Sequence, residues 1–554
     1  MASENQDSES LFQERLVVGL RNTGAYPHAV DRVELIETHI SYVVLAGEYV
    51  YKIKKAVELG FLDFRSLDSR LFYCNEELRL NRRTAPDLYL KVVPIDGTAE
   101  HPRVAGAGRA IEYAVMMRRF EQAARLDCML ANQRLTPGII DELATRIVDF
   151  HRSITVARPE QGFGTLQTIA EPARQNIAQL MPLLEREDDR AALTAYGDWL
   201  EAQHDRLGDL FARRLDAGFV RECHGDLHLA NIVLIDARVV LFDCIEFNEQ
   251  FRWIDVFNEV SFLAMDLRSR GKPDWSWRLI DRYLEATGDF EGLSLLRYYV
   301  AYRAMVRAKV DLIRARQLTR GDRAAVIDPV LLEKGHAHLQ LALSCCAPAR
   351  PSILITHGPS GSGKTSGSLA LLERLGAIRL RSDIERKRLH GVPILAHGGD
   401  QPGRGLYAAD ATHATYARLR ELARDIVHSG YPAIVDAAFL QRWQRESFRS
   451  LAADLGVPFA IIDFSAPPGC LRARVASRHA SGSDASDADL AVLEHQLATH
   501  EPLQSDEADF ILDLDARRSP DSLRHDATWR PLDQFLGRFP AATSPPLESA
   551  RNQK

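Results

Sequence analysis

The sequence predicts a mixed α+β domain followed by an α/β domain with a parallel sheet. The 554 residues are too many for one ordinary core. A short segment with two prolines, residues 344–351, separates a helical run from a new strand. Beyond this linker, apolar runs alternate with helical runs, as in parallel sheets. We therefore expect domains at residues 11–343 and 352–540, with disordered tails at 1–10 and 541–554.

The composition is that of a globular protein without a membrane span. Hydrophobic residues make up 46% and charged residues 26% of the chain, and the net charge is −7. This charge gives no general attraction to nucleic acid, so a nucleic-acid partner is disfavoured. The first ten residues are polar and acidic, unlike a signal peptide. The seven cysteines are scattered and contain no Cys-x-x-Cys pair, which favours reduced thiols and a cytoplasmic location.

The amino-terminal part begins with strands and becomes helical. Residues 40–53 predict a strand pair around a turn at residues 46–48. Residues 66–83 have helical spacing of their apolar positions, and residues 111–117 form a short apolar run typical of a strand. Between residues 139 and 343 the pattern is largely helical, with short breaks. This order of elements predicts an α+β domain.

The most specific motif is a phosphate-binding loop, residues 358–365, which fits G-x-x-x-x-G-K-[ST]. An apolar strand, 353–355, precedes it and helical sequence, 366–375, follows. Glycines allow backbone N–H groups to surround phosphate oxygens at the start of the helix. Lys364 is expected to reach the β- and γ-phosphates and Thr365 to ligate Mg²⁺. The residues expected to bind ATP here are Gly358, Gly361, Ser362, Gly363, Lys364, Thr365 and Ser366.

Two aspartates follow predicted strands of the same domain. Asp383 comes after the strand at 377–380, and Asp436 ends the strand at 433–435. A carboxylate just beyond a strand's carboxyl end faces the ligand crevice of an open α/β sheet. We expect Asp383 to accept a proton from an acceptor hydroxyl and Asp436 to orient Mg²⁺ or bind the acceptor. For each aspartate, a helix N-cap is the alternative.

Two arginines complete the candidate site of the carboxy-terminal domain. Arg474 and Arg478 lie four residues apart on a predicted helix. They are candidates to close over the transferring phosphoryl oxygens as a lid. A solvated helix face is the alternative.

With these motifs, residues 351–539 resemble the small P-loop kinases of the zeta-toxin and polynucleotide-kinase type. The resemblance implies an α/β P-loop NTPase fold and phosphoryl transfer from ATP or GTP to a hydroxyl group. Relatives of this kind act on nucleotide sugars, sugars or polynucleotide ends, so the resemblance does not identify the acceptor.

A second constellation lies in the amino-terminal domain. His224-Gly225-Asp226 is followed by Asn231, and Asp243 comes after a predicted strand at 239–242. The spacing matches a kinase catalytic loop, in which Asp226 accepts the hydroxyl proton while Asn231 and Asp243 hold Mg²⁺. An Asp-Ala turn between two apolar runs predicts a hairpin in the same stretch.

The His-Gly-Asp opening resembles the aminoglycoside phosphotransferase and choline-kinase group, over about residues 11–343. This resemblance implies a two-lobed protein-kinase-like fold. It places Lys52 on the strand whose lysine pairs with ATP phosphates, and it places the lysine's partner, Glu77 or its neighbour Glu76, on the following helix. Residues 112–116 resemble the hinge strand that meets the adenine ring.

Several points stay open in this domain. Lys54 and Lys55 are close rivals of Lys52, and a solvated lysine on an edge strand is a further alternative. No G-x-G-x-x-G loop precedes Lys52, and the turn at 46–48 is minimal. A degenerate, non-catalytic domain therefore remains an alternative, since fold does not guarantee activity.

Other polar residues have a functional and a structural interpretation. His224 and His228 could form a metal site, although a histidine bonded to the backbone is the favoured interpretation. Asp255 is expected to support the catalytic loop as a structural residue. The basic stretch from Arg303 to Arg316 could bind an anion, but a solvated helix face is favoured.

These patterns together predict a bifunctional, ATP- and Mg²⁺-dependent phosphotransferase with two nucleotide sites and small-molecule hydroxyl acceptors of unknown identity. One alternative is a nucleotide-binding regulatory protein whose first domain is a pseudokinase. Another is a nucleic-acid-end or nucleotide-sugar kinase, which salt-dependent binding to oligonucleotides would support. The oligomeric state and the choice between ATP and GTP stay open.

Overall fold

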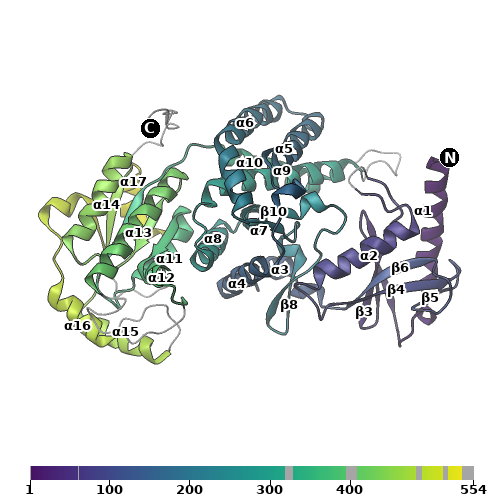
Figure 1. The fold of residues 1–554 in the computed structure, drawn as a ribbon, viewed down its shortest axis with the longest axis horizontal. Coiled ribbons are helices and arrows are strands. Elements are labelled where there is room, and N and C mark those ends of the chain that lie inside the picture. Colours follow the sequence, from purple (N-terminus) through teal and green to yellow (C-terminus); the bar gives the residue numbers. More distant parts are fainter. Residues whose placement is uncertain are drawn as a thin grey trace. The chain divides into compact units, whose positions relative to one another are not determined.

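The chain forms two compact units. A computed structural model describes residues 2–59, 62–317, 328–394, 408–481, 489–515, 522–523 and 525–538. The first unit comprises Met1–Ala178 with Glu201–Asp266, and the second comprises Gln179–Leu200 with Leu267–Lys554. Figure 1 labels the helices and some of the strands of both units.

The first unit opens with a six-stranded antiparallel sheet in the order β1-β2-β3-β6-β4-β5. Helix α2 (Leu67–Asn81) crosses one face of this sheet (Figure 1), with Cys74 packed against Val115 and neighbouring apolar residues. Ser66 caps its first turn, because its side chain accepts a hydrogen bond from the N–H of Ser69. The strands are β1 (Val33–Glu37), β2 (Ser41–Ala46), β3 (Tyr49–Lys54), β4 (Tyr89–Gly97), β5 (Pro102–Val104) and β6 (Glu112–Arg118).

The amino-terminal segment differs from the disordered tail expected at residues 1–10. Helix α1 (Ala2–Gly19) includes most of these residues. Leu16 and Val17 of this helix are buried in the core beside the sheet, and Glu9 forms an ion pair with Arg70, at 2.7 Å. The helix therefore has an apolar face to bury, which the polar first residues alone do not reveal. The expected tail at 541–554 lies outside the described residues.

A helical lobe with two short strand pairs follows in the first unit. Strands β8 (Ile232–Ile235) and β9 (Arg238–Leu241) form the predicted hairpin, and both turn residues, Asp236 and Ala237, have positive φ. A second antiparallel pair joins β7 (Val220–Glu222) to β10 (Trp253–Asp255). The helices are α3 (Leu126–Ala131), α4 (Pro137–Ser153), α5 (Leu166–Leu180), α6 (Glu187–Asp216) and α7 (Val256–Ser269), of which the last three continue into the second unit.

The second unit contains the predicted parallel sheet. Five strands in the order β12-β13-β11-β14-β15 pair only in parallel. Leu354, Ile434 and Ile462 point to one face and form a core with α11 and α17. The strands are β11 (Ile353–His357), β12 (Ile378–Arg381), β13 (Ala433–Asp436), β14 (Phe459–Ser465) and β15 (Ile511–Asp515). The helices after β11 are α11 (Lys364–Leu375), α12 (Ser382–Leu389), α13 (Ala409–His428), α14 (Arg442–Leu455), α15 (Pro468–Ser481), α16 (Leu490–Thr499) and α17 (Asp526–Leu536).

Three helices that precede the predicted linker also belong to the second unit. They are α8 (Pro273–Thr287), α9 (Leu293–Gln317) and α10 (Pro329–Ser344). The predicted domain boundary at residues 344–351 thus lies inside a compact unit. Helix α8 packs against α11 and β12.

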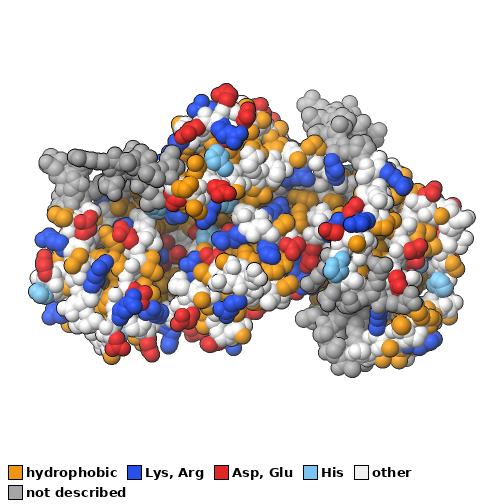
Figure 2. Space-filling view, turned by 180° about the vertical axis from the view of Figure 1, so that it is seen from behind, with side chains coloured by type: hydrophobic (Ala, Val, Ile, Leu, Met, Phe, Trp, Pro, Cys, Tyr) orange, Lys and Arg blue, Asp and Glu red, His pale blue; other side chains and the backbone are white. Residues whose placement is uncertain are grey.

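The surface shows both signs of charge. On the face drawn in Figure 2, acidic and basic side chains of the described residues are interspersed and neither sign forms one continuous patch. Among the described helices, none is at once long and apolar enough to cross a lipid bilayer. All seven cysteines are free thiols.

Candidate functional site

The loop between β11 and α11 has the backbone of a phosphate cradle. Gly358, Gly361 and Gly363 have φ of 135°, 81° and 89°, values that side chains disfavour. A Cβ at Gly358 would lie 2.6 Å from the carbonyl oxygen of Phe464. At Gly363, a Cβ would meet nothing within 4 Å. The space at the start of α11 is therefore open, where backbone N–H groups and the helix dipole favour an anion.

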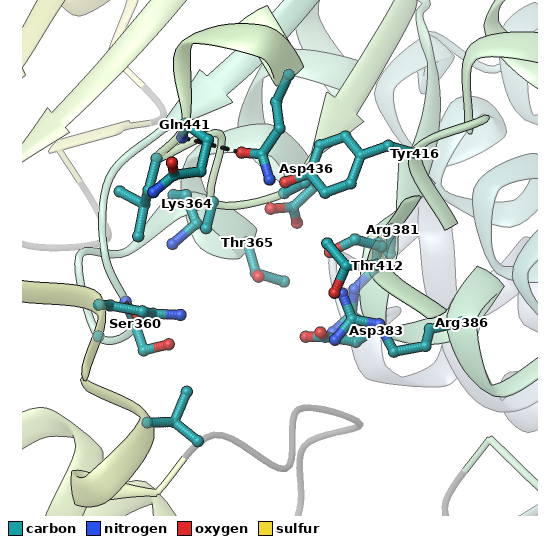
Figure 3. A pocket seen from close by; sticks show the side chains of 18 of the residues that line it. Ser360, Lys364, Thr365, Arg381, Asp383, Arg386, Thr412, Tyr416, Asp436 and Gln441 are labelled. Atoms are coloured by element: carbon teal, nitrogen blue, oxygen red, sulfur yellow. Dashed lines mark hydrogen bonds between the residues drawn. The ribbon is translucent and has the colours of Figure 1, made fainter. Parts of the chain in front are cut away.

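A cavity of about 590 Å³ opens from this loop (Figure 3). The P-loop side contributes Ser360, Lys364, Thr365 and Ser366 to its lining, and the ends of the neighbouring strands contribute others. Figure 3 shows Lys364 and Thr365 facing the space across from Asp383. The Nζ of Lys364 donates a hydrogen bond to the carbonyl of Pro359, at 2.8 Å, within its own loop. The residues present fit an Mg²⁺-nucleotide, since a cation, a hydroxyl and open backbone donors share one cavity.

Both predicted aspartates line this cavity. Asp436 ends β13, and the hydroxyl of Ser368 donates to its Oδ2 at 3.0 Å. Asp383 is the second residue of α12, and the N-cap position belongs to Arg381. Gln441 holds the N-cap position of α14, the first helix after Asp436. Neither aspartate is therefore an N-cap residue.

The predicted lid arginines lie on α15. Arg474 lines the cavity and its Nη1 lies 3.4 Å from the carbonyl oxygen of Gly361. The side chain of Arg478 lies outside the described part of the structure. The sequence did not single out α16, yet Gln496 accepts a hydrogen bond from the N–H of Ser360, at 2.8 Å. Helices α15 and α16 thus both contact the P-loop.

In the first unit, the structure brings Lys52 together with two carboxylates. Its Nζ lies 2.8 Å from Glu77 Oε1 and 2.5 Å from Asp243 Oδ1. Burial alone would lower the pKa of Lys52, but Asp243 and Glu77 raise this pKa well above its usual value. Lys52 and Lys54 lower the pKa of Glu77 against the opposite effect of burial. At neutral pH Lys52 and Glu77 are therefore charged.

The rival lysines have other partners. The Lys54 side chain is fully buried and pairs with the same glutamate and with Glu246. Lys55 pairs at 2.5 Å with Glu37, whose side chain is 60% exposed. Lys52 is thus the lysine of the three whose Nζ contacts Asp243. The sequence reasoning missed Glu246, although it lies three residues after this aspartate.

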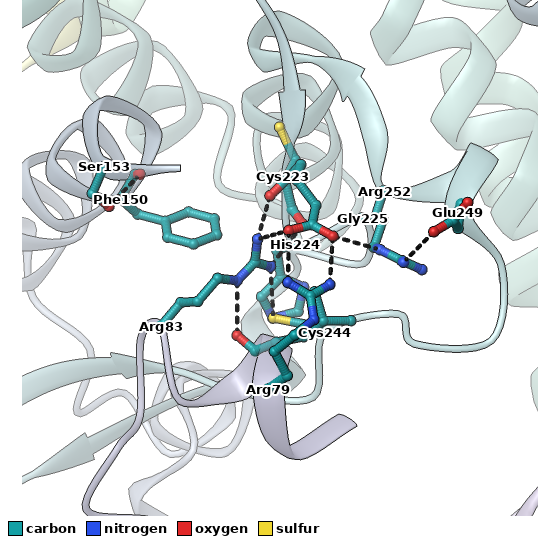
Figure 4. A network of polar contacts seen from close by, with 12 residues as sticks. Arg79, Arg83, Phe150, Ser153, Cys223, His224, Gly225, Cys244, Glu249 and Arg252 are labelled. Carbon is teal, nitrogen blue, oxygen red and sulfur yellow. Dashed lines mark hydrogen bonds and ion pairs between the residues drawn. The ribbon is translucent and has the colours of Figure 1, made fainter. Parts of the chain in front are cut away.

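The other glutamate of α2, Glu76, belongs to a second polar network, of which Figure 4 shows Arg79, Arg83 and Arg252. It pairs with Arg79 at 2.6 Å and with Arg252 at 2.9 Å. Arg79 also pairs with Glu222 at 2.6 Å, and Arg83 donates to the backbone carbonyl of the same glutamate at 2.5 Å. This network ties α2 to β7, the strand that leads into the catalytic loop.

The catalytic-loop residues contact one another as their spacing suggests. Asn231 Nδ2 donates to Asp226 Oδ2 and to its backbone carbonyl, both at 3.0 Å. The N–H of Phe242 donates to the carbonyl of Asn231 at 3.0 Å, which links the loop to the hairpin. Asp243 follows with φ of 66° and a side chain that is 41% exposed. Its carboxylate is accessible to a ligand.

The two histidines of the loop bond to different groups. His224 is fully buried, and its Nε2 lies 2.8 Å from the carbonyl oxygen of Phe242. His228 Nε2 lies 3.4 Å from Asp226 Oδ2. The rings do not share a ligand position in this geometry, which favours the structural interpretation of His224.

A buried carboxylate that the sequence reasoning missed, Glu259, bonds to the backbone of the loop. Glu259 Oε1 accepts from the N–H groups of His224 and Gly225, at 2.6 and 2.8 Å, and its Oε2 lies 2.8 Å from His151 Nε2. Asp255, expected to be structural, pairs with the buried Arg214 at 2.7 Å. The bonds of Glu259 hold the backbone at the start of the loop, whereas Asp255 bonds outside it.

Charged side chains of the predicted hinge strand and of the basic stretch bond to other residues of the protein. Strand β6 contains residues 112–116, and Glu112 is buried against Arg70 at 3.0 Å. On α9, Arg303 is 7% exposed, and Arg316 donates to the carbonyl of Leu183 at 2.7 Å. These two arginines do not form a solvated face.

The buried pair of Lys54 and Glu246 yields a prediction. Lys54→Met leaves a buried carboxylate without its partner, so we expect the free energy of unfolding to fall by about 3–5 kcal/mol. The double variant Lys54→Met/Glu246→Leu should recover much of this loss. Lys55→Met, whose partner is exposed, should cost less than about 1 kcal/mol. Urea denaturation would measure these changes. Equal losses of unfolding free energy for Lys54→Met and Lys55→Met would contradict the assignment of Lys54 and Glu246 as a buried ion pair.

Comparison with known proteins agrees with the P-loop assignment. Residues 353–503 match the family model described as an AAA domain. The uncharacterized protein Rv2004c of Mycobacterium tuberculosis is 29% identical over 456 residues, which cover 82% of this chain and 88% of that protein.

Two solved structures are each similar to a share of the chain. An amicoumacin kinase is 12% identical with a TM-score of 0.37, covering 59% of this chain and 95% of its own. A gluconokinase from Sinorhizobium meliloti is 21% identical with a TM-score of 0.25, covering 34% of this chain and 94% of its own. The chain thus joins an α+β unit with a six-stranded antiparallel sheet to an α/β unit with a parallel sheet and a P-loop, and the AAA domain match lies within the second unit.

Proposed function

We propose that the protein is an ATP-dependent phosphotransferase that transfers phosphoryl groups to hydroxyl groups of small molecules at two separate nucleotide sites. The observation that supports this most is the P-loop cavity. It contains the open start of α11 with Lys364 and Thr365 and, across the same space, the carboxylate of Asp383. A nucleotide end and an acceptor end in one cavity are what direct phosphoryl transfer requires.

In the P-loop cavity, each group has a defined task. Backbone N–H groups and Lys364 bind the phosphates, and Thr365 and Asp436 would hold Mg²⁺, which supplies neutralising charge when bound. Asp383 accepts the proton of the acceptor hydroxyl at a carboxylate oxygen. Arg474, already beside the loop at Gly361, orients phosphoryl oxygens and excludes water.

In the first unit, we infer the same chemistry on a different scaffold. Asp226 accepts the hydroxyl proton, Asn231 and Asp243 would hold Mg²⁺, and Lys52 orients the phosphates from its pair with Glu77. The turn between β1 and β2 contains no glycine, so Lys52 takes a larger share in phosphate binding. The formed Lys52–Glu77 pair favours an active domain over a pseudokinase.

The direct test is ATP turnover by the full chain, with and without a pool of small hydroxylated metabolites. We expect Asp226→Ala and Lys364→Ala each to remove a distinct, metabolite-stimulated part of the turnover, by about 100-fold or more. The double variant should retain neither part. If Asp226→Ala changes nothing while Lys364→Ala abolishes all turnover, the first unit is a binding or regulatory module.

The role of Asp383 is testable apart from nucleotide binding. We expect Asp383→Asn to lower kcat for transfer about 10²- to 10⁴-fold, because the amide cannot accept the hydroxyl proton. The affinity for ATP should change little, since the phosphates bind at the other end of the cavity. Asp410→Asn, on the exposed start of α13, is the matched control. A loss of ATP affinity with unchanged kcat would contradict the role of a base.

A further inference from the structure

Helix α8 presents one stripe of residues to the α/β sheet within the second unit. The stripe recurs about every four positions, as on one face of a helix. A Cβ at Gly376, the C-cap of α11, would lie 2.7 Å from the Trp277 ring, so the two elements are in close contact. The stripe consists of Trp277, Asp281 and Glu285.

The acidic part of the stripe holds Arg379 of β12. This arginine side chain is fully buried. Its Nη2 lies 2.7 Å and its Nε 3.3 Å from the two carboxylate oxygens of Asp281, and Nη2 lies 2.9 Å from Glu285 Oε1. Two carboxylates and a two-point contact fix the plane of the guanidinium group.

The other edge of the same guanidinium faces the P-loop site. Arg379 Nη1 donates to the carbonyl of Thr365 at 3.2 Å and to the hydroxyl of Ser368 at 3.4 Å. That hydroxyl lies 3.0 Å from Asp436 Oδ2. Arg379 therefore contacts the backbone of Thr365 and, through Ser368, the side chain of Asp436. Thr365 and Asp436 are the two proposed Mg²⁺ ligands.

We propose that α8 belongs functionally to the P-loop site. Asp281 and Glu285 fix the orientation of Arg379, and Arg379 positions Thr365 and Asp436 for binding Mg²⁺-ATP. This rests on the proposed function of the P-loop cavity. Groups behind metal ligands set the orientation of those ligands, and their loss weakens metal binding. Arg379 is a positioning residue, since it acts through Thr365 and Ser368.

The proposal has a consequence for the organisation of the chain. Helix α8 precedes the segment at residues 344–351, which the sequence marks as a linker, and Asp281 is 98 residues before Arg379. Residues after the linker therefore do not contain all of the P-loop site.

A second ion pair of α8 provides a control for the effect of packing alone. Arg278 of α8 pairs with Glu373 of α11 at 2.9 Å, and these side chains are 10% and 14% exposed. This pair joins α8 to α11, whereas the Asp281–Arg379 pair joins α8 to β12, and both pairs are mostly buried. Glu373 does not line the P-loop cavity. If the two substitutions acted only by loosening the packing of α8, Asp281→Asn and Glu373→Gln should therefore change nucleotide binding alike.

The experiment uses the full chain and titrates ATP by calorimetry with and without Mg²⁺. Binding that Lys364→Ala removes defines the P-loop site. At that site we expect Asp281→Asn to weaken binding of Mg²⁺-ATP about 10- to 100-fold. Binding of ATP without Mg²⁺ should change by less than about threefold, because Lys364 and the loop backbone are unaltered. Glu373→Gln should leave both affinities unchanged.

Other outcomes would overturn the proposal. Equal effects of Asp281→Asn and Glu373→Gln, or an equal loss with and without Mg²⁺, would make Arg379 an ordinary structural residue. If Asp281→Asn does not fold, Glu285→Gln serves instead, because it removes one charge and leaves the two-point contact with Asp281. If Lys364→Ala removes no binding from the parent chain, the proposed function of the P-loop cavity fails first.

Discussion

Lys52 and Lys54 are buried and stay charged because carboxylates from distant parts of the sequence surround them. Lys52 and Lys54 lie among Glu77, Asp243 and Glu246. Removing one member of such a group would leave an uncompensated charge away from water, which costs several kcal/mol. The strands and helices that carry these residues are therefore held in register by charge as well as by apolar packing.

The same constraint gives each candidate site its geometry. In the first unit, Glu259 holds the backbone of the catalytic loop while Lys52 contacts Asp243. In the second unit, Arg379 joins α8 to Thr365 and to the serine beside Asp436. Catalytic positioning needs tolerances of well under an ångström, and a buried ion pair with several hydrogen bonds is stiff enough to supply them. The residues that set the chemistry thus depend on residues that never touch a substrate.

Local patterns of the sequence predicted those structural elements that are determined by residues close together in the chain. The P-loop, the hairpin after Asn231 and the parallel strands follow from turn chemistry and hydrophobic periodicity, and the structure contains them. The choice of Lys52 over Lys54 could not follow from spacing, because both lie on one face of β3 and both contact Glu77. Only Asp243, 191 residues further on, distinguishes them. The position of α8 beyond the predicted linker likewise depends on tertiary contacts that have no local signature.

We propose that one chain binds two nucleotides at independent sites. Native mass spectrometry of the full chain with Mg²⁺ and a non-hydrolysable ATP analogue would count the bound nucleotides directly. We expect two bound nucleotides per chain, one after Lys364→Ala, and one after a substitution of Lys52. A single nucleotide on the parent chain, lost completely in Lys364→Ala, would contradict it.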